Sequence, residues 1–202
     1  GAMAVSTAVS AGSFSAFAVA QCVAYSGSNV NDQDYVQWSD TVKSYLTVCD
    51  NGNYMRVQSG AIEGKLLVEY YSSDFEPLST KLIDNELPVF GAFYDSGDNY
   101  YVLSGQENPK QNDSLEVFRI TKYDKNWNKI KSCGLYGANT TVPFDAGSAR
   151  MTHSGDHLLV RTCHKMYKSS DGNNHQANVT IEVDMPSMTI TDSYTGVMNV
   201  DY

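Results

Sequence analysis

The amino-acid sequence predicts an all-β protein built from about three copies of a four-stranded, propeller-type blade. Three observations lead to this expectation: short runs of apolar and β-branched residues alternate with polar ones, Gly, Asn and Asp turns separate the runs, and each group of four runs recurs. The recurrence, roughly every 45 to 58 residues, fits propeller blades better than solenoid coils. A β-sandwich is the alternative, because evenly spaced strands also build sandwiches.

The chain divides into segments on this pattern. Its first three residues are typical of a cleaved expression tag. Alternation in 14–21 predicts one or two strands, and the helical spacing of Trp38, Val42 and Leu46 predicts a short helix or an ordered connector. The expected divisions are a tag remnant at 1–3, N-terminal strands and a connector at 4–44, blades at 45–85, 86–138 and 139–196, and the start of a further blade at 197–202.

The strands within each blade are expected to follow one another as a meander. The turns Asn51-Gly52, Ser96-Gly97-Asp98 and Ser154-Gly155-Asp156 supply the positive-φ residues that short hairpins need between the first two strands. The second strands 100–103 and 157–160 are apolar on both faces, which is typical of strands covered by neighbouring blades. The motifs Ser-x-Asp-Phe and Asp-x-x-Trp mark the turns from third to fourth strand.

Three blades are too few to close a ring, since propellers usually have four to eight. The last residues, 197–202, begin another strand and then stop. An open propeller would expose edge strands and an apolar blade face. We therefore expect a partner that completes the propeller: the remainder of a longer or cleaved protein, a second chain, or a second copy.

The composition excludes some partners. The net charge of −9 and the pI near 4.7 would repel phosphate backbones and anionic lipids, so neither nucleic acid nor a membrane is expected as a partner. Fourteen tyrosines, together with many Asn, Ser, Asp and Thr residues, are typical of secreted β-proteins that bind polar ligands.

Four cysteines lie far apart, without a C-x-x-C pair that would indicate structural zinc or a redox site: Cys22, Cys49, Cys133 and Cys163. Buried free thiols are the expected state, because Cys behaves as a small hydrophobic residue. One disulfide is the alternative if the protein is secreted, and the spacing does not say which.

The candidate site lies on the face that carries the long loops, expected at 105–114, 134–147 and 164–176. Long loops on a rigid scaffold usually carry function, whereas the short hairpins opposite need only close the chain. Candidate catalytic residues are Arg150, Arg161, His164, His175 and Glu107. Candidate ligand-binding residues are Gln106, Asn108, Asn139, Lys165, Asp171 and Gln176.

Two interpretations of the Arg and His residues stay open. Arg150, Arg161 and His164 are expected to lie close together, where paired guanidinium groups could hold a carboxylate, sulfate or phosphate. Alternatively, the arginines neutralise structural carboxylates such as Asp145 or Glu107. A metal held by His164, His175 and Asp171 matches no established spacing, and no calcium, nucleotide or nucleophile motif is complete. We therefore expect neither a metal nor another cofactor.

The strings 161–167 and 171–176, together with the repeats, resemble the β-propeller portion of large secreted proteins of Gram-positive bacteria. The similarity covers roughly residues 25 to 202 as a whole pattern. This resemblance implies a secreted or cell-surface location and a longer parent chain.

Two functions follow as hypotheses. The first is an extracellular binding or adhesion module whose long-loop face recognises a glycan or a peptide. The second is a secreted hydrolase, lyase or sulfuryl-transfer enzyme that uses the Arg and His residues at the central channel. Propellers carry both kinds of function, so the fold class alone does not decide between them.

Overall fold

The fold is all-β throughout the part of the chain that the structure describes, a computed structural model of residues 41–145, 147 and 149–196. Thirteen strands form three antiparallel sheets, and no helix occurs among these residues. Each sheet contains a four-stranded meander, and one carries an extra edge strand. This is the strand arrangement of propeller blades and confirms the predicted fold class.

The chain forms two compact units, of which the first contains the described residues 43–84 and the second contains residues 41–42 together with the described residues from 85 onward. The strand predicted within 14–21, most of the connector, and the expected start of a further blade at 197–202 lie outside the described residues. Leu46, expected in a helix or connector, lies in a strand and pairs with Arg56. The helical spacing of Trp38, Val42 and Leu46 was misleading because Leu46 already belongs to the strand that begins at Ser44.

The first unit is one sheet in the order β1-β2-β3-β4, whose strands are Ser44–Val48, Tyr54–Ile62, Lys65–Tyr71 and Pro77–Asp84. One face is apolar, because cross-strand partners such as Val57 and Val68 place their side chains on the same side. The buried apolar side chains of this face are Met55, Val57, Leu66, Val68 and Ile83. They form the hydrophobic core of the unit.

The opposite face of this sheet has a buried carboxylate at its centre. Glu69 on β3 is fully buried, and its Oε2 accepts hydrogen bonds from Arg56 Nε at 2.6 Å and Gln58 Nε2 at 2.7 Å. The Tyr71 hydroxyl donates to Oε1 at 3.0 Å. The carboxylate is thus both paired with a cation and fully hydrogen-bonded, as burial of a charge requires.

The second unit begins with a sheet in the order β5-β6-β7-β8, whose strands are Val89–Asp95, Tyr100–Gly105, Glu116–Tyr123 and Lys129–Tyr136. Every residue of β6 is buried, so the prediction that this strand is covered on both faces is confirmed. One face carries a cluster of aromatic rings with centroids 4.9 to 5.7 Å apart: Phe93, Tyr100, Tyr123 and Trp127.

The other sheet of the second unit has the order β10-β11-β12-β13, whose strands are Arg150–Ser154, His157–Lys168, Asn174–Asp184 and Thr189–Tyr194. The extra strand β9, Thr140–Pro143, pairs with the far part of β11, so that β9 and β10 share one edge of this long strand. Along β11, the buried residues Leu158, Val160, Thr162 and His164 alternate with exposed or partly exposed ones.

That alternation corrects one expectation about β11. The segment 157–160 was predicted to be covered on both faces, but His157 and Leu159 are exposed. Their face of the sheet is open in the described part of the chain, and most of its residues are polar, including Arg161, Thr180 and Glu182. The apolar run in the sequence therefore contributes only Leu158 and Val160 to the core.

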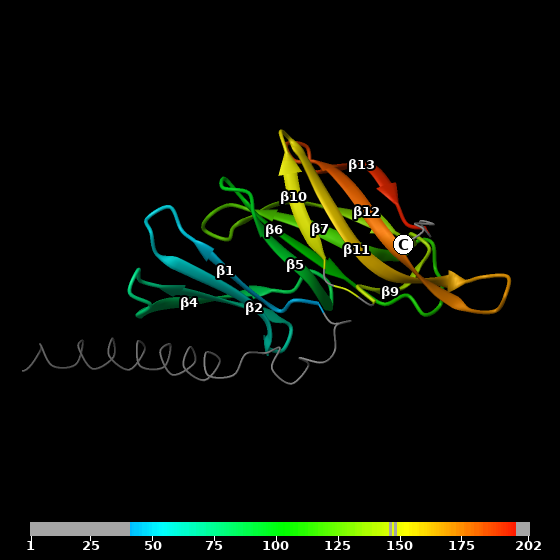
Figure 1. The fold of residues 1–202 in the computed structure, drawn as a ribbon, viewed down its shortest axis with the longest axis horizontal. Helices are drawn as coiled ribbons and strands as arrows, with labels where there is room; N and C mark the ends of the chain where they lie inside the picture. The colour runs from blue at the N-terminus through cyan, green and yellow to red at the C-terminus, as the bar shows by residue number, and fades with distance from the viewer. Residues whose placement is uncertain (1–40, 146, 148, 197–202) are drawn as a thin grey trace, which may run out of the picture. The chain divides into compact units, whose positions relative to one another are not determined.

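The two sheets of the second unit pack against each other with equivalent strands together. Strand β5 contacts β10, β8 contacts β13, and the two meanders lie across one another in Figure 1. Adjacent propeller blades pack in the same way. The Phe144 ring, which follows β9, fills the space beside Gly91 and Gly105, where an added Cβ atom would come within 3 Å of it. This contact fixes Phe144 against the β5–β8 sheet.

One five-residue turn recurs between third and fourth strands. In it, Asp124 Oδ1 accepts from the backbone N–H groups of Asn126 and Asn128, both at 2.8 Å, and the Ser72 hydroxyl oxygen accepts in the same way from residues 74 and 76. The fourth residue of both turns is left-handed, with φ of 63° at Phe75 and 64° at Trp127. The third meander has a four-residue turn, 185–188, which ends with a left-handed Met188 at 50°. The two motifs predicted to mark these turns are confirmed.

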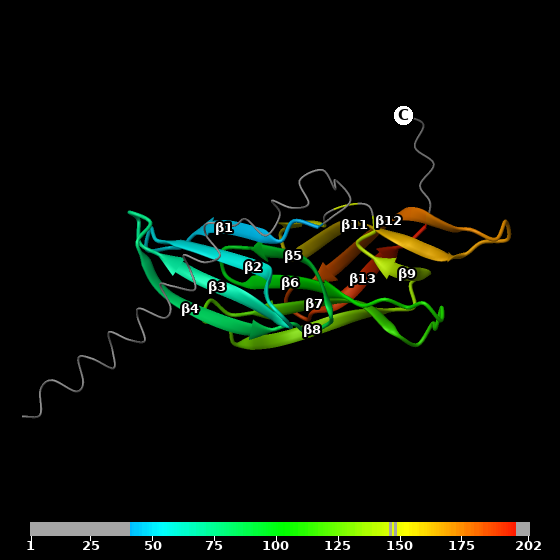
Figure 2. The same ribbon diagram turned by 90° about the horizontal axis from the view of Figure 1, so that it is seen from below.

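Two of the expected long loops are largely strand. Lys165 pairs with Gln176 and Lys168 with Asn174, so the segment 164–176 is a hairpin whose turn is only 169–173. The cross-strand hydrogen bonds continue because the polar side chains of this segment are compatible with an exposed ladder. Figure 2 shows this hairpin, β11–β12, extending beyond the other strands of the second unit. Segment 134–147 likewise contains the end of β8 and all of β9.

Candidate functional site

The two arginines expected at the site are cross-strand neighbours. Arg150 on β10 pairs with Arg161 on β11, and both side chains are on the open face of the sheet. Arg161 Nη1 donates to Thr180 Oγ1 at 2.5 Å, and Arg150 Nη1 donates to the Ala149 carbonyl at 3.2 Å. The guanidinium groups therefore lie on the solvated, open face of the sheet.

His164 lies on the opposite face of β11 and is completely buried. The Thr140 hydroxyl donates to the Ala138 carbonyl at 2.8 Å, so its oxygen accepts the hydrogen bond from His164 Nδ1 at 2.6 Å. Nε2 is then the unprotonated nitrogen and has no hydrogen-bond partner among the described residues. Burial lowers the pKa of His164 to about 4, although the Thr195 backbone, which would bond the protonated ring, acts in the other direction. The ring is neutral at pH 7 and inaccessible.

His175 and Asp171 form a separate exposed pair on the β11–β12 hairpin, with His175 Nε2 and Asp171 Oδ2 2.7 Å apart. Hydrogen bonds from the Asn173 backbone and from His175 lower the pKa of Asp171. Gln176, on the same hairpin, donates from Nε2 to Asp145 Oδ2 at 2.9 Å. The structure thus divides the expected catalytic residues among the open face of the sheet, its interior and the hairpin.

Several expected ligand-binding residues hold the loop between β6 and β7 in place. The Asn108 backbone N–H donates to the Thr141 carbonyl at 2.8 Å, and its Nδ2 donates to the Tyr167 hydroxyl at 3.0 Å. Asn139 Oδ1 accepts from the Tyr167 N–H at 3.1 Å, and Gln106 Nε2 donates to the Glu116 carbonyl at 2.6 Å. These side chains bind other parts of the protein and make the long-loop end rigid.

A pocket of about 250 Å³ lies at this long-loop end. Residues from the β6–β7 loop, from β9 and from the β11–β12 hairpin line it: Glu107, Pro109, Gln111, Thr141, Val142, Lys165 and Asn174. Glu107 and Lys165 are among the residues expected from the sequence, whereas Gln111, Thr141 and Asn174 were missed. No motif marks these three, because only the pairing of β9 with β11 brings them to the loop.

The polar groups of this pocket differ in how they are used. Thr141 Oγ1 donates to the backbone of the β11 bulge, and Asn174 Nδ2 donates to the Met166 carbonyl at 2.8 Å. The Glu107 carboxylate, the Gln111 amide and the Lys165 ammonium group have no partner within the described residues. Acceptors and donors are therefore both free at the rim, around the apolar side chains of Pro109 and Val142. We refer to this site as the long-loop pocket.

The cysteines do not suggest a reactive centre. Cys49, Cys133 and Cys163 are free thiols of intermediate exposure, and Cys22 lies outside the described residues. Burial raises the pKa of Cys133 to about 11 and also raises that of Cys163, so both remain thiols at neutral pH.

Two further observations concern the described residues alone. Their His, Cys, Asp and Glu side chains form no group of three or more that is placed to hold a metal ion. None of their segments is a helix with the length and apolar character needed to cross a bilayer.

Comparisons with known proteins found similarity among solved structures but not among family models or curated sequences. No family model matches its sequence, and no curated protein does. Among solved structures, a GH43 β-1,3-galactosidase with bound galactodeoxynojirimycin is similar at a TM-score of 0.41 and 11% sequence identity. The alignment covers 74% of this chain, which spans only 44% of the galactosidase chain.

Proposed function

We propose that this protein is an extracellular binding module whose long-loop pocket takes a neutral polar ligand, most suitably a glycan. The proposal depends on one observation: in a single pocket, the Glu107 carboxylate and the Lys165 ammonium group are both without a partner in the described residues and do not pair with each other. A carboxylate accepts hydrogen bonds and an ammonium group donates them. Sugar hydroxyls do both, so one hydroxylated ligand satisfies both charges.

The surroundings of the pocket support recognition of a ligand in a fixed geometry. Asn108 is almost completely buried and holds the β6–β7 loop on β9 and on Tyr167. Burial and a hydrogen bond to Asp113 raise the pKa of Tyr167, so its hydroxyl stays protonated and continues to support this contact. A rigid rim loses little conformational entropy when the ligand binds.

Binding is preferred to catalysis because the residues expected for catalysis are not assembled. Glu107 lies in the pocket, but His164 is buried at Thr140 and His175 pairs with Asp171 on the hairpin. A general acid or base must reach the group from which it takes, or to which it gives, a proton. Of Glu107, His164 and His175, only Glu107 lines the long-loop pocket.

The proposal is tested by screening the protein on a glycan array and measuring the best ligand by calorimetry. Glu107→Gln and Lys165→Met are each expected to weaken binding by about tenfold, since each removes one charge-assisted hydrogen bond. Matched controls are Glu63→Gln, in the first unit, and Lys110→Met, outside the pocket lining; both are exposed and should leave the affinity unchanged. Failure to bind any glycan, or binding that survives both pocket substitutions, would overturn the proposal.

A further inference from the structure

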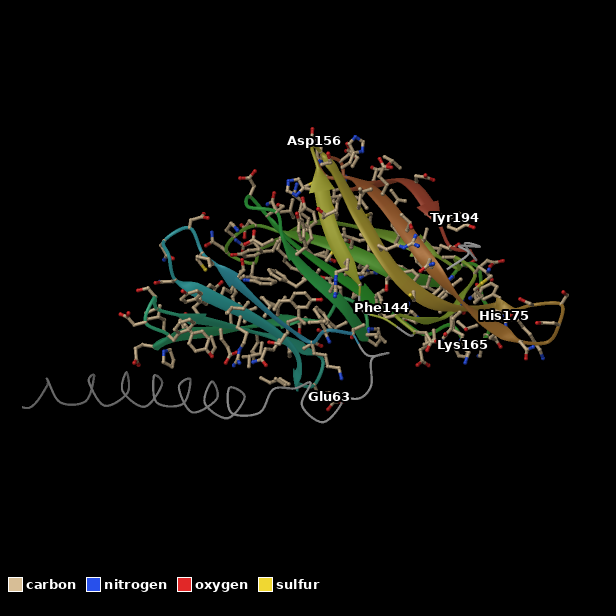
Figure 3. The ribbon with its side chains drawn as sticks, viewed as in Figure 1. Glu63, Phe144, Asp156, Lys165, His175 and Tyr194 are labelled. Atoms are coloured by element: carbon tan, nitrogen blue, oxygen red, sulfur yellow. The ribbon has the colours of Figure 1, made fainter. Side chains whose placement is uncertain are left out.

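A second hollow lies at the opposite end of the second unit, where short hairpins were expected only to close the chain. It has a volume of about 310 Å³ and lies among the β5–β6 hairpin, the β10–β11 hairpin and the β12–β13 turn. Figure 3 shows Asp156 at the tip of the β10–β11 hairpin, far along the same sheet from Lys165 and His175. We call this site the hairpin hollow, and its lining residues are Ser96, Asp98, Asn99, Tyr101, Lys122, His153, Gly155, Asp156, Met185 and Pro186.

Two carboxylates of the hollow occupy equivalent positions in the repeat. Asp98 and Asp156 each end a Ser-Gly-Asp hairpin between the first and second strands of a meander. The contact between β5 and β10 brings these hairpins to one end of the unit. Neither carboxylate has a partner in the part of the chain that the structure describes.

The cationic and imidazole groups of the hollow are engaged elsewhere. Lys122 Nζ donates to the Met185 carbonyl at 3.0 Å and lies 6.0 Å from the centre of the Tyr101 ring. His153 Nδ1 is 2.7 Å from the Tyr94 hydroxyl. In the described residues, no ion pair joins Lys122 or His153 to either aspartate, so the hollow keeps an excess of negative charge.

Tyr101 provides an independent sign of a missing ligand. Its side chain is 0% exposed and lines the hollow, yet its hydroxyl has no hydrogen-bond partner among the described residues. Burial, and next the charge of Asp98, raise the pKa of Tyr101 to about 12, which keeps the phenol protonated. Buried polar groups are almost always hydrogen-bonded, so this one requires an explanation.

We propose that the hairpin hollow binds an alkylammonium group, the side chain of a lysine in a partner peptide. An ammonium group has three donors and no acceptor, which matches two free carboxylates and the oxygen of a phenol. The methylene groups of the lysine side chain would lie against Met185 and Pro186, which supply apolar surface in the lining. The net charge of −9 favours the approach of a cationic peptide over long distance.

An amino sugar is the less suitable ligand. It presents the same ammonium group, but its several ring hydroxyls also need donors; Lys122 Nζ and His153 already have partners, which leaves the single O–H group of Tyr101 without one among the described residues. The lining also offers the apolar contacts that methylene groups need. The site is therefore assigned to an alkyl chain that ends in an ammonium group.

The experiment is a titration with Nα-acetyl-L-lysine amide, followed in the amide NMR spectrum at Gly97 and Gly155. Both glycines belong to the hairpins that bound the hollow. We expect saturable shifts of these two signals, weakening as salt is added. Nα-acetyl-L-norleucine amide, which has the alkyl chain without the ammonium group, should cause no shift, and D-glucosamine should bind at least about tenfold more weakly than the lysine probe.

Three variants connect the binding to the proposed contacts. Asp98→Asn and Asp156→Asn are each expected to weaken the lysine probe about tenfold, and Tyr101→Phe about threefold, with unchanged strand content. Asp50→Asn, at the corresponding hairpin of the first unit, is the matched control and should have no effect. Absence of shifts, equal shifts with norleucine amide, tighter binding of glucosamine, or affinity that survives both aspartate substitutions would each overturn the proposal.

Discussion

The β1–β4 sheet and the β9–β13 sheet each bury one titratable side chain completely, and they do so in opposite ways. Glu69 has Arg56, Gln58 and Tyr71 around its two carboxylate oxygens. Among the described residues, the side chain of His164 has one hydrogen bond, to Thr140, and it is held neutral because burial lowers its pKa to about 4. One sheet compensates a buried charge, and the other avoids forming one.

The difference shows how each sheet should respond to change. A compensated charge depends on its partners, since removal of one partner leaves the charge buried and poorly solvated. A neutral imidazole depends on pH, because a proton supplied by the solvent creates the charge that the site cannot accommodate. The first sheet should therefore be sensitive to mutation at its ion pair, and the second to acid.

The largest expected effect is that of breaking the ion pair in the first sheet. Arg56→Met is predicted to reduce the free energy of unfolding by about 3 to 5 kcal/mol, because the Glu69 carboxylate remains buried without its cation. The double variant Arg56→Met with Glu69→Leu should recover much of this loss, since no charge then remains. Urea unfolding followed by circular dichroism measures both.

Lys65→Met is the matched control in the same sheet. Lys65 pairs with Asp84 on the surface, and exposed pairs contribute little to stability. If Arg56→Met proves no more destabilising than Lys65→Met, the buried pair does not have the role assigned to it, and the contrast between the sheets is lost.

Acid should act on the second sheet with the next largest effect. The pKa of His164 is about 4 in the folded state, against an ordinary 6.5, so between these values the unfolded chain binds more protons. The contribution of His164 to the free energy of unfolding is fully present above pH 6.5. It falls by about 3 kcal/mol in total as the pH is lowered to 4. Comparison of the pH dependence of unfolding in the wild type and in His164→Gln isolates the effect.

The control for this prediction is His175→Gln, which changes an exposed imidazole and should retain the steep dependence. Asp171 and Asp184, whose pKa values are lowered from an ordinary 3.8 by hydrogen bonds, titrate below the window of interest. If the imidazole signal of His164 titrates near pH 6.5 in the NMR spectrum of the folded protein, its pKa is not lowered, and the buried imidazole is not the cause of the acid sensitivity.

The smallest effect concerns the turns between the third and fourth strands of the two sheets. Met188, the left-handed residue of the β12–β13 turn, is buried, whereas Phe75, the left-handed residue of the β3–β4 turn, is exposed and stacks on Tyr54 with the ring centroids 4.4 Å apart. Met188→Ala is predicted to cost about 2 to 3 kcal/mol, as core truncations do. Phe75→Ala should cost about 1 kcal/mol, the size of one aromatic contact. If Met188→Ala and Phe75→Ala destabilise the protein equally in thermal unfolding, the loss comes from the backbone conformation of the turn and not from the packing of the side chain.

Features determined by neighbouring residues were predictable from the sequence. The glycines of the hairpins, with φ of 81° at Gly52, 97° at Gly97 and 56° at Gly155, lie where short-range turn rules place them. The third-to-fourth turns follow for the same reason, since Asp124 and Ser72 bind backbone groups only two and four residues away. Local chemistry is sufficient to specify such elements.

Features that depend on distant pairing were not predictable. The extension of β11 and β12 into a long hairpin depends on register, and the polar sequence of 164–176 resembles a loop. The hairpin hollow depends on the packing of β5 against β10, which no single segment reveals. The sequence did carry one signal of it, the repeated Ser-Gly-Asp at 96–98 and 154–156, which marks equivalent positions in two adjoining blades.

The slot that Gly91 and Gly105 leave for the Phe144 ring links three positions in evolution. A side chain at either glycine would overlap the ring or the backbone beside it, and Phe144 itself has an unfavourable φ of 59° that its packing must offset. A smaller residue at 144 would empty the slot and remove the ring contact at both glycines, although Pro143 and the Val117 carbonyl would still confine position 105. In more distant relatives, we therefore expect these three sites to change together, and their joint retention would identify chains that connect two blades in the same way.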